Sequence, residues 1–218
     1  MAERLVFIPS DQQDLVRTLS FRFVWNPGFA VVQKQKNITA LHWAAARSGY
    51  SPLLEISTKS AEELGRQLSA FNLKVQSQQF GEIPLECAFQ GGKVFERGGP
   101  YTDLYHSEPR DAKRDPRLRE SGRLVGFAFG EQRFPLEPKT AFYDWLYASA
   151  LWPHREALGQ LCQFAGFTDI EFNPGRSVNC QARACALFVA VVKRHLLDDA
   201  MSSEAAFVRL LGQHLPCE

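Results

Sequence analysis

The chain has 218 residues, of which 45% are hydrophobic and 22% are charged, as in a globular protein long enough to bury a sizeable core. Its 25 basic and 24 acidic residues leave a net charge of +1. The global charge therefore argues neither for nor against a nucleic-acid partner, and local charge must decide. The five cysteines are odd in number and include no CxxC pair, which argues against a disulfide framework and against a zinc site.

The sequence carries no sign of a membrane protein. The N-terminal segment is charged from the start and lacks the apolar core of a signal peptide. No apolar run approaches the ~18 residues of a membrane span, and the longest, Ala184 to Val192, predicts a buried helix. We therefore expect a cytoplasmic protein in a reducing compartment, with no membrane partner.

The first half of the chain is expected to mix short strands with helices. Runs of β-branched, aromatic and aliphatic residues predict strands over Arg4–Ile8, Ser20–Trp25 and Leu53–Ile56. Apolar residues at helical spacing predict a helix over Ile38–Ser48 that stops at Gly49. Ser60, followed by Glu63, has the pattern of a capping box for a helix through Leu68.

The middle of the chain is expected to be less regular. Leu85–Phe95 predicts a helix that runs into the turn Gly98–Pro100. Asp103–Gly122 is polar and contains two prolines, which predicts a surface loop. Leu124–Phe134 alternates loosely around two glycines and predicts a hairpin.

The last third is expected to be strongly helical. Apolar residues at helical spacing predict helices over Lys139–Leu151, Arg155–Phe164, Gln181–Leu197 and Glu204–His214. Pro174-Gly175 predicts a turn. Without an internal repeat or a low-complexity linker, we expect a single compact domain over residues 1–218. Its predicted class is α+β, predominantly helical, with a few short strands.

The segment Pro84–Lys93 is the most informative for chemistry. Glu86, Phe89, Gln90 and Lys93 are spaced i, i+3, i+4 and i+7, so they share one face of the predicted helix. Such a face is unusual for a buried core and for a plain solvent-exposed surface, because it combines an acid, an aromatic ring, an amide and a base. A functional face and a salt-bridged surface helix both remain open. Just upstream, Ser69 and Asn72 either cap turns or hydrogen-bond a ribose or phosphate.

These elements resemble the NADAR (YbiA-like) domain family. Leu68–Leu73 is similar to the Ser-Asn-Phe element of the family, and Pro84–Lys93 is similar to its Pro-x-x-Glu-x-x-Phe-Gln-x-x-Lys helix. Asn179–Arg194 is similar to its C-terminal Asn-x-x-Gly/Ala-x-x-Leu helix. The resemblance covers residues 55–194, with residues 1–54 as an extension packed on that core. The family's Trp-Gly-x-Gly stretch is replaced by Phe172–Val178, so no acidic role is carried over there.

The resemblance is stronger to one branch, the NADAR antitoxins encoded beside DarT-type toxins, which ADP-ribosylate DNA bases. The segments that carry it are Gln33–Lys36, Leu54–Ser60, Phe89–Phe95, Gly98–Leu104 and Leu136–Leu146. This resemblance implies an antitoxin that removes ADP-ribose from guanine in DNA. It also implies ADP-ribosylated DNA as substrate, ADP-ribose as product and a cognate toxin as a partner.

Cleavage of an N-glycosidic bond needs an anion near the oxocarbenium-like state, an activated attacking group and a proton for the leaving base. Glu86 is the first candidate for the anion and general base, and Asp144, set among aromatic residues, is the second. Lys59 is a candidate for the diphosphate or, as a lesser option, for a Schiff base with the opened ribose. A surface location remains the alternative for Asp144 and Lys59.

The remaining ADP-ribose contacts divide by chemistry. Lys93 would meet the diphosphate, and an aromatic platform would stack on a base. The predicted ADP-ribose-binding residues are Ser69, Asn72, Gln90, Lys93, Tyr101, Trp145 and Asn179. For each aromatic ring, core packing is the alternative. No cluster has metal-ligand spacing, so we expect neither a metal nor another cofactor.

DNA binding is expected at residues 110–123. Six basic and three acidic residues leave this segment with a local charge of +3, which suits backbone phosphates. The predicted contacts are Arg114, Arg117 and Arg119, and a solvated, partly paired loop is the alternative. Two other functions stay open. The first is an N-glycosidase for a small phosphoribosyl or nucleotide metabolite, which would not need this segment. The second is a non-catalytic ADP-ribose-binding module, which would tolerate the loss of Glu86.

Overall fold

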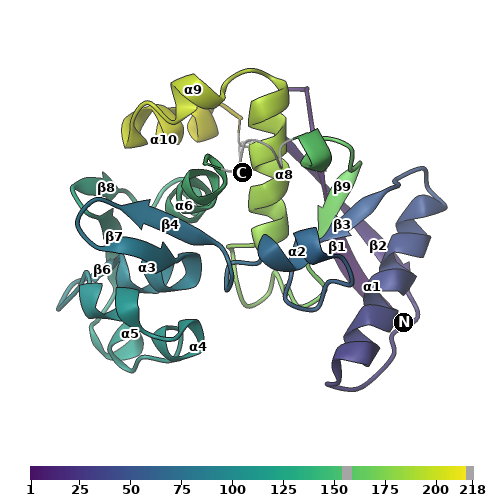
Figure 1. Ribbon diagram of the computed structural model, residues 1–218, viewed down its shortest axis with the longest axis horizontal. Helices are drawn as coiled ribbons and strands as arrows, with labels where there is room; N and C mark the ends of the chain where they lie inside the picture. The colour runs from purple at the N-terminus through teal and green to yellow at the C-terminus, as the bar shows by residue number, and fades with distance from the viewer. Residues whose placement is uncertain (154–158, 215–218) are drawn as a thin grey trace. The chain divides into compact units, whose positions relative to one another are not determined.

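The computed structural model describes residues 1–153 and 159–214, and its contacts divide the chain into two compact units (Figure 1). Of the described residues, 1–69, 159–197 and 214 belong to unit 1, and 70–153 and 198–213 belong to unit 2. Helices account for 40% and strands for 21% of the structure. The expected predominance of helix is therefore wrong, and the fold is mixed α+β, with three sheets in the described residues. Whether the whole chain acts as the predicted single domain stays a prediction.

Unit 1 is built on a four-stranded sheet with the order β2-β1-β9-β3. The strands are β1 (Ala2–Pro9), β2 (Val16–Phe23), β3 (Leu53–Glu55) and β9 (Gly166–Thr168). β1 pairs antiparallel with β2 along its whole length and with β9 at Val6 and Phe7, whereas β3 pairs parallel with β9. The parallel pair thus joins segments that lie more than 100 residues apart in the sequence.

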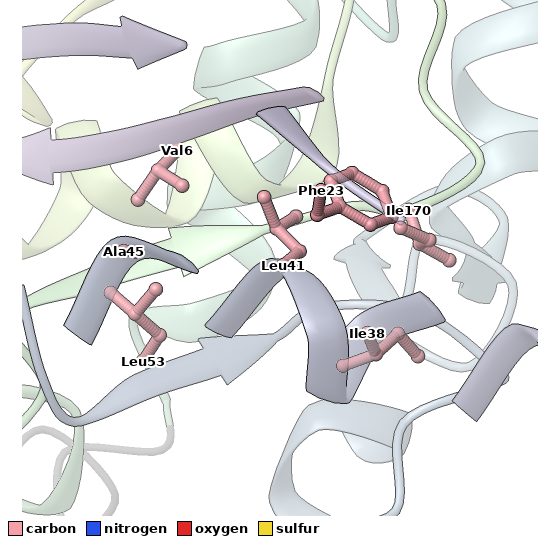
Figure 2. Close-up of a cluster of buried hydrophobic side chains, with 7 residues drawn as sticks. All are labelled: Val6, Phe23, Ile38, Leu41, Ala45, Leu53 and Ile170. Carbon is pink, nitrogen blue, oxygen red and sulfur yellow. The ribbon is translucent and has the colours of Figure 1, made fainter. Parts of the chain in front are cut away.

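Helices cover this sheet on both faces. Neighbouring side chains of a strand point to opposite faces, and Val6 and Phe7 of β1 are both buried. α1 (Val31–Ala46) lays Ile38, Leu41 and Ala45 on a cluster formed with side chains of the sheet (Figure 2). α8 (Gln181–Lys193) packs on β1, β2 and β9, and the short α2 (Glu63–Gln67) belongs to the same unit.

Unit 2 holds a hairpin, a small sheet and several helices. The hairpin β4 (Lys74–Ser77) and β5 (Gly81–Pro84) leads directly into α3 (Leu85–Gly91). A second sheet has the order β6 (Lys93–Phe95), β7 (Leu124–Phe129), β8 (Gln132–Phe134). The remaining helices, with their bounds, are η1 (Thr102–His106), α4 (Pro109–Ala112), α5 (Arg117–Glu120), α6 (Ala141–Leu151), α9 (Leu197–Ala200) and α10 (Glu204–His214). α6 packs on α3 and β4, and η1 and α4 pack on α3.

Long or strongly patterned elements match the sequence-based predictions. The strands predicted at Arg4–Ile8, Ser20–Trp25 and Leu53–Ile56 are confirmed, as are the hairpin over Leu124–Phe134 and the helices α6, α8 and α10. The helix predicted over Ile38–Ser48 is present but already begins at Val31. The helix predicted over Arg155–Phe164 lies partly outside the described residues.

Three predictions about short segments are wrong. The loop expected over Asp103–Gly122 contains η1, α4 and α5, each too short for a periodic pattern to be read. The helix expected over Leu85–Phe95 ends at Gly91, and its last residues form β6. Ser60 does not cap α2: the helix starts after Glu62, whose backbone N–H donates to Ser60 Oγ at 3.3 Å.

Candidate active site

Three of the side chains singled out in the sequence, Glu86, Gln90 and Lys93, come together at α3 in unit 2. The helix starts as soon as β5 ends at Pro84, and backbone N–H groups of Leu85 and Glu86 donate to Leu73 and Ala70, at 2.8 and 3.1 Å. These bonds anchor the first turn to the preceding segment. They also fix the start of α3, from which the Glu86 side chain emerges.

A continuous chain of polar contacts runs along α3. Gln90 Nε2 donates to Glu86 Oε1 at 2.8 Å, and Lys93 Nζ donates to Gln90 Oε1 at 2.6 Å. At the other end Lys113 Nζ lies 3.5 Å from Glu86 Oε1. Glu86 is only 5% exposed, as is Gln90. The result is one buried carboxylate and one amide between two ammonium groups, with two positive charges against one negative.

Aromatic rings line this polar chain. Lys93 Nζ lies 4.9 Å from the centroid of the Phe89 ring, and Lys113 Nζ lies 5.7 Å from that of Phe71. Burial lowers the pKa of Lys93 to about 8, the charge of Glu86 raises it and the charge of Lys113 lowers it. Lys93 can therefore exchange its proton near neutral pH. The spacing argument missed Lys113 as a partner of Glu86, because its segment looked like a loop.

The two glycines at the end of α3 are required by packing. A Cβ on Gly91 would lie 2.7 Å from the Tyr101 carbonyl oxygen, and one on Gly92 would lie 2.6 Å from Phe142 Cζ and 2.8 Å from the Ala128 carbonyl oxygen. Any side chain would therefore push the helix end off its neighbours.

The other candidates in unit 2 have varied surroundings. Asp144 is buried in the first turn of α6. Trp145 packs against Phe134, with ring centroids 5.1 Å apart. Tyr101 is covered by the Arg117 guanidinium, 4.5 Å from the ring centroid, and Asn72 is exposed. The Trp145 ring lies in a core position, while the roles predicted for all four stay predictions.

Three candidates belong to unit 1. Lys59 Nζ donates to Thr58 Oγ1 at 3.0 Å. Ser69 is fully buried after α2. Asn179 precedes α8, and its buried Oδ1 has no hydrogen-bond partner in the described residues. An unsatisfied buried acceptor is uncommon in folded proteins, and a bound water or a ligand donor would satisfy it. The roles predicted for all three residues stay predictions.

Unit 1 also contains a buried polar network that the sequence did not predict. Glu55 at the end of β3 accepts hydrogen bonds from Ser57 Oγ at 2.8 Å and from the Ile170 backbone N–H at 2.9 Å, and its Oε2 lies 2.7 Å from Thr168 Oγ1. Thr168 Oγ1 lies 2.8 Å from His42 Nε2 on α1. Burial raises the pKa of Glu55 to about 8 and lowers that of His42 to about 4.

The expected DNA-binding arginines differ in their engagement. Arg117 pairs with Asp115 at 2.9 Å and with Asp103, and these bonds raise the already high pKa of the Arg117 guanidinium. Arg114 and Arg119 are exposed, and neither forms an ion pair with any residue that the structure describes. They are the two available for phosphates.

Within residues 1–153 and 159–214, no group of three or more His, Cys, Asp or Glu side chains is placed to hold a metal ion. None of the helices in that same part of the chain is long and apolar enough to cross a membrane.

A family model described as the DarT1-associated NADAR antitoxin matches residues 2–216. No curated protein matches the sequence.

Proposed function

Because the chain belongs to the DarT1-associated NADAR antitoxins, we propose that it removes ADP-ribose from guanine bases in DNA by hydrolysing the N-glycosidic bond. The reaction breaks the bond between the ribose anomeric carbon and the base nitrogen. Water supplies the hydroxyl group of the released ADP-ribose, and the base leaves with a proton. The toxin's modification is thereby reversed and the DNA restored.

One observation carries this proposal: the chain of contacts Lys113–Glu86–Gln90–Lys93. A buried carboxylate is the group that an oxocarbenium-like state needs beside it, or that draws a proton from an attacking water. The two flanking ammonium groups suit a diphosphate, which binds cations strongly where water is partly excluded. Asp144 is the proposed second acid, for the proton that the leaving base takes up.

The decisive experiment uses defined substrates. The protein is incubated with oligonucleotides that carry ADP-ribose on guanine or on thymine, and the products are identified by mass spectrometry. We expect free ADP-ribose and unmodified oligonucleotide from the guanine substrate. Persistence of the guanine adduct at high protein concentration would reject the proposed reaction.

A small nucleotide or phosphoribosyl metabolite is the competing substrate, and one observation favours it. Several cations of residues 110–123 are engaged within the protein: Lys113 with Glu86, Arg117 with Asp103 and Asp115, and Arg123 with Glu96. Such pairs reduce the charge left for DNA. Comparing turnover of the modified oligonucleotide with that of the modified mononucleotide separates the two, because only a DNA enzyme should prefer the longer substrate.

A further inference from the structure

One stretch of unit 1 is free of acidic residues. Between Asp14 and Glu55 the sequence has no Asp or Glu over 40 residues, yet it has five cations: Arg17, Arg22, Lys34, Lys36 and Arg47. The whole chain, by contrast, has nearly equal numbers of acids and bases. This stretch contains β2 and α1, so the positive excess belongs to one part of the fold.

The outer face of α1 is apolar and aromatic as well as basic. Val32, Lys36, Thr39 and Trp43 follow each other at intervals of four, three and four residues, so they form one stripe along the helix. All four are exposed: Trp43 is 70% exposed, and Phe29, just before the helix, is 98% exposed. The opposite face of α1 is the one that packs on the sheet (Figure 2).

Part of the positive charge is not neutralised within the protein. Arg22 pairs with Glu3 and Lys34 pairs with Glu171. Arg17, Lys36 and Arg47 are exposed, and no acidic side chain in the described residues pairs with them. Lys36 lies on the same stripe as Trp43, about 10 Å along the helix axis from it. A cation and a flat ring are thus presented to solvent on the same face of α1, about two turns apart.

We propose that this face of α1, formed by Phe29, Val32, Lys36, Trp43 and Arg47, binds single-stranded DNA that flanks the modified base. Exposed bases stack on aromatic rings, and the phosphates between them attract the cations. Duplex DNA does not fit the same face as well, because its base faces are hidden in the stack. The absence of acids favours a polyanion over a protein partner or a second copy of this chain, since neither is uniformly negative.

This inference rests on DNA as the proposed substrate, but it can be tested on unmodified DNA. Fluorescence anisotropy with an oligothymidylate of roughly a dozen nucleotides should show binding that weakens with salt. Trp43→Leu should weaken binding about five-fold or more, the scale of one base–aromatic stack, while Trp43→Phe should retain most of it. Lys36→Glu should weaken binding and flatten the salt slope by about 0.7.

Matched controls lie in unit 2. Val125→Ala removes an exposed apolar side chain, and Arg209→Glu on α10 makes the same change of sign as Lys36→Glu. Neither should alter binding. The proposal is overturned if Trp43→Leu binds DNA like the wild-type protein, or if Trp43→Phe binds as weakly as Trp43→Leu. It is also overturned if Trp43→Leu changes only the molecular mass measured by light scattering, because that result would indicate self-association.

The failure of this inference and the failure of the proposed function give different results. If only the inference is wrong, the wild-type protein still releases ADP-ribose from the guanine adduct and the Trp43 variants do so equally well on long and short substrates. If only the reaction is wrong, no ADP-ribose is released, yet oligothymidylate still binds and the binding depends on Trp43.

Discussion

The carboxylate of Glu86 lies in a buried position where it contributes little to the stability of the fold. It is 5% exposed, and its described partners are one amide at 2.8 Å and one ammonium at 3.5 Å. A buried charge loses its hydration, and a single long ion pair rarely compensates for that loss, so an apolar residue of similar size would often serve stability as well. This position is the reason to test a chemical role for Glu86.

The first prediction follows from this position. Glu86→Gln should keep the hydrogen bond to Gln90 and the shape of the site, but lose the negative charge. The rate of ADP-ribose release should fall by ~100-fold or more, the range for losing a positioned base or charge stabiliser. Binding of ADP-ribose, measured by titration calorimetry at pH 6.5, should change little, because a diphosphate does not need a carboxylate nearby.

A control separates chemistry from folding. Glu82→Gln changes an exposed glutamate on the neighbouring β5, so it should retain full activity, and melting curves of both variants show whether they are folded. A folded Glu86→Gln protein with the wild-type rate would rule out this role and leave Asp144 as the acid to test.

The second prediction concerns the proton on Lys93. Its pKa is lowered to about 8, mainly by burial, so the ammonium is present below that pH and is lost above it. If this ammonium binds the diphosphate, the affinity for ADP-ribose should decrease as the pH rises above about 8. Lys93→Ala should bind ~10-fold or more weakly at pH 6.5, the loss of a charge-assisted hydrogen bond, and show no such decrease.

Two variants should move this pH midpoint in opposite directions. Glu86 raises the pKa of Lys93 and Lys113 lowers it. The midpoint should therefore move to lower pH in Glu86→Gln and to higher pH in Lys113→Gln, as read from calorimetric titrations between pH 6.5 and 9.5. Equal midpoints in all three proteins would show that Lys93 is not the titrating group.

Single residues were predictable where their partners are close in sequence. Glu86 and Gln90 lie one turn apart on α3, and the i, i+4 spacing indicated their contact. Lys93 contacts Gln90 from the start of β6 and not from the helix face that the spacing predicted. Lys113 and Glu55 were not assigned their partners, because those partners are brought together only by tertiary packing: Glu86 lies 27 residues from Lys113, and Thr168 lies 113 residues from Glu55. One sequence holds no local signal for such contacts.

At the scale of elements, the three predicted DNA-binding arginines of the segment with α4 and α5 fall into two groups. One forms ion pairs within the protein, and the other two are exposed. Arg117 ties α5 to η1 through Asp103 and to the segment just before α5 through Asp115. Arg114 and Arg119 have no such bonds in the described part of the chain. A single charge count over residues 110–123 could not separate these roles, since it does not show which cations are already paired.

The third prediction uses that division. Arg114→Glu with Arg119→Glu should weaken binding of modified DNA and flatten its salt dependence by about 0.7 for each phosphate of a single strand that the protein no longer neutralises. Binding of free ADP-ribose should be unchanged. Arg117→Ala should instead lower the melting temperature, since it leaves two acids without their shared cation. Unchanged DNA affinity and salt slope in the double variant would make the segment a solvated surface and favour a small substrate.

Elements were predictable in proportion to their length. The apolar pattern of α6, α8 and α10 spans several turns, so packing and local preference agree. β4, β5 and β9 have three or four residues each, and their strand state depends on a partner rather than on a pattern. Overlooking these strands, and reading the strand β6 as helix, produced the mistaken expectation of a predominantly helical fold.

At the scale of the whole molecule, the buried network of Glu55, Thr168 and His42 predicts that the stability of the fold depends on pH. Glu55 joins β3 to β9, and His42 connects both to α1. A protonated Glu55 can donate to Thr168 Oγ1, which in turn can donate to the unprotonated Nε2 of His42. This arrangement satisfies each polar group without a buried charge.

The directions of the pKa shifts define a pH range in which Glu55, among these groups, dominates the pH dependence of stability. Its pKa rises from 4.5 to about 8, so the folded state holds the extra proton and stability falls as the pH rises through this interval. The pKa of His42 falls from 6.5 to about 4, which makes stability increase with pH below 6.5. Burial raises the pKa of Asp169 to about 6, so its contribution also ends below 6.5. Between pH 6.5 and 8, Glu55 dominates among these groups.

The last prediction is that Glu55→Gln removes this dependence. An amide cannot ionise, its oxygen can still accept from Ser57 and Ile170, and its NH2 group can donate to Thr168 as the protonated acid does. The melting temperature of the wild-type protein should therefore fall between pH 6.5 and 8.5, by roughly 2–4 °C for each kcal/mol lost, whereas that of Glu55→Gln should stay nearly level and be higher than the wild type at pH 8.5. Glu131→Gln, at an exposed turn, should behave like the wild type in differential scanning calorimetry. Equal slopes in Glu55→Gln and the wild-type protein would mean that Glu55 is not the group that titrates, and the network would then have to carry a buried charge at neutral pH.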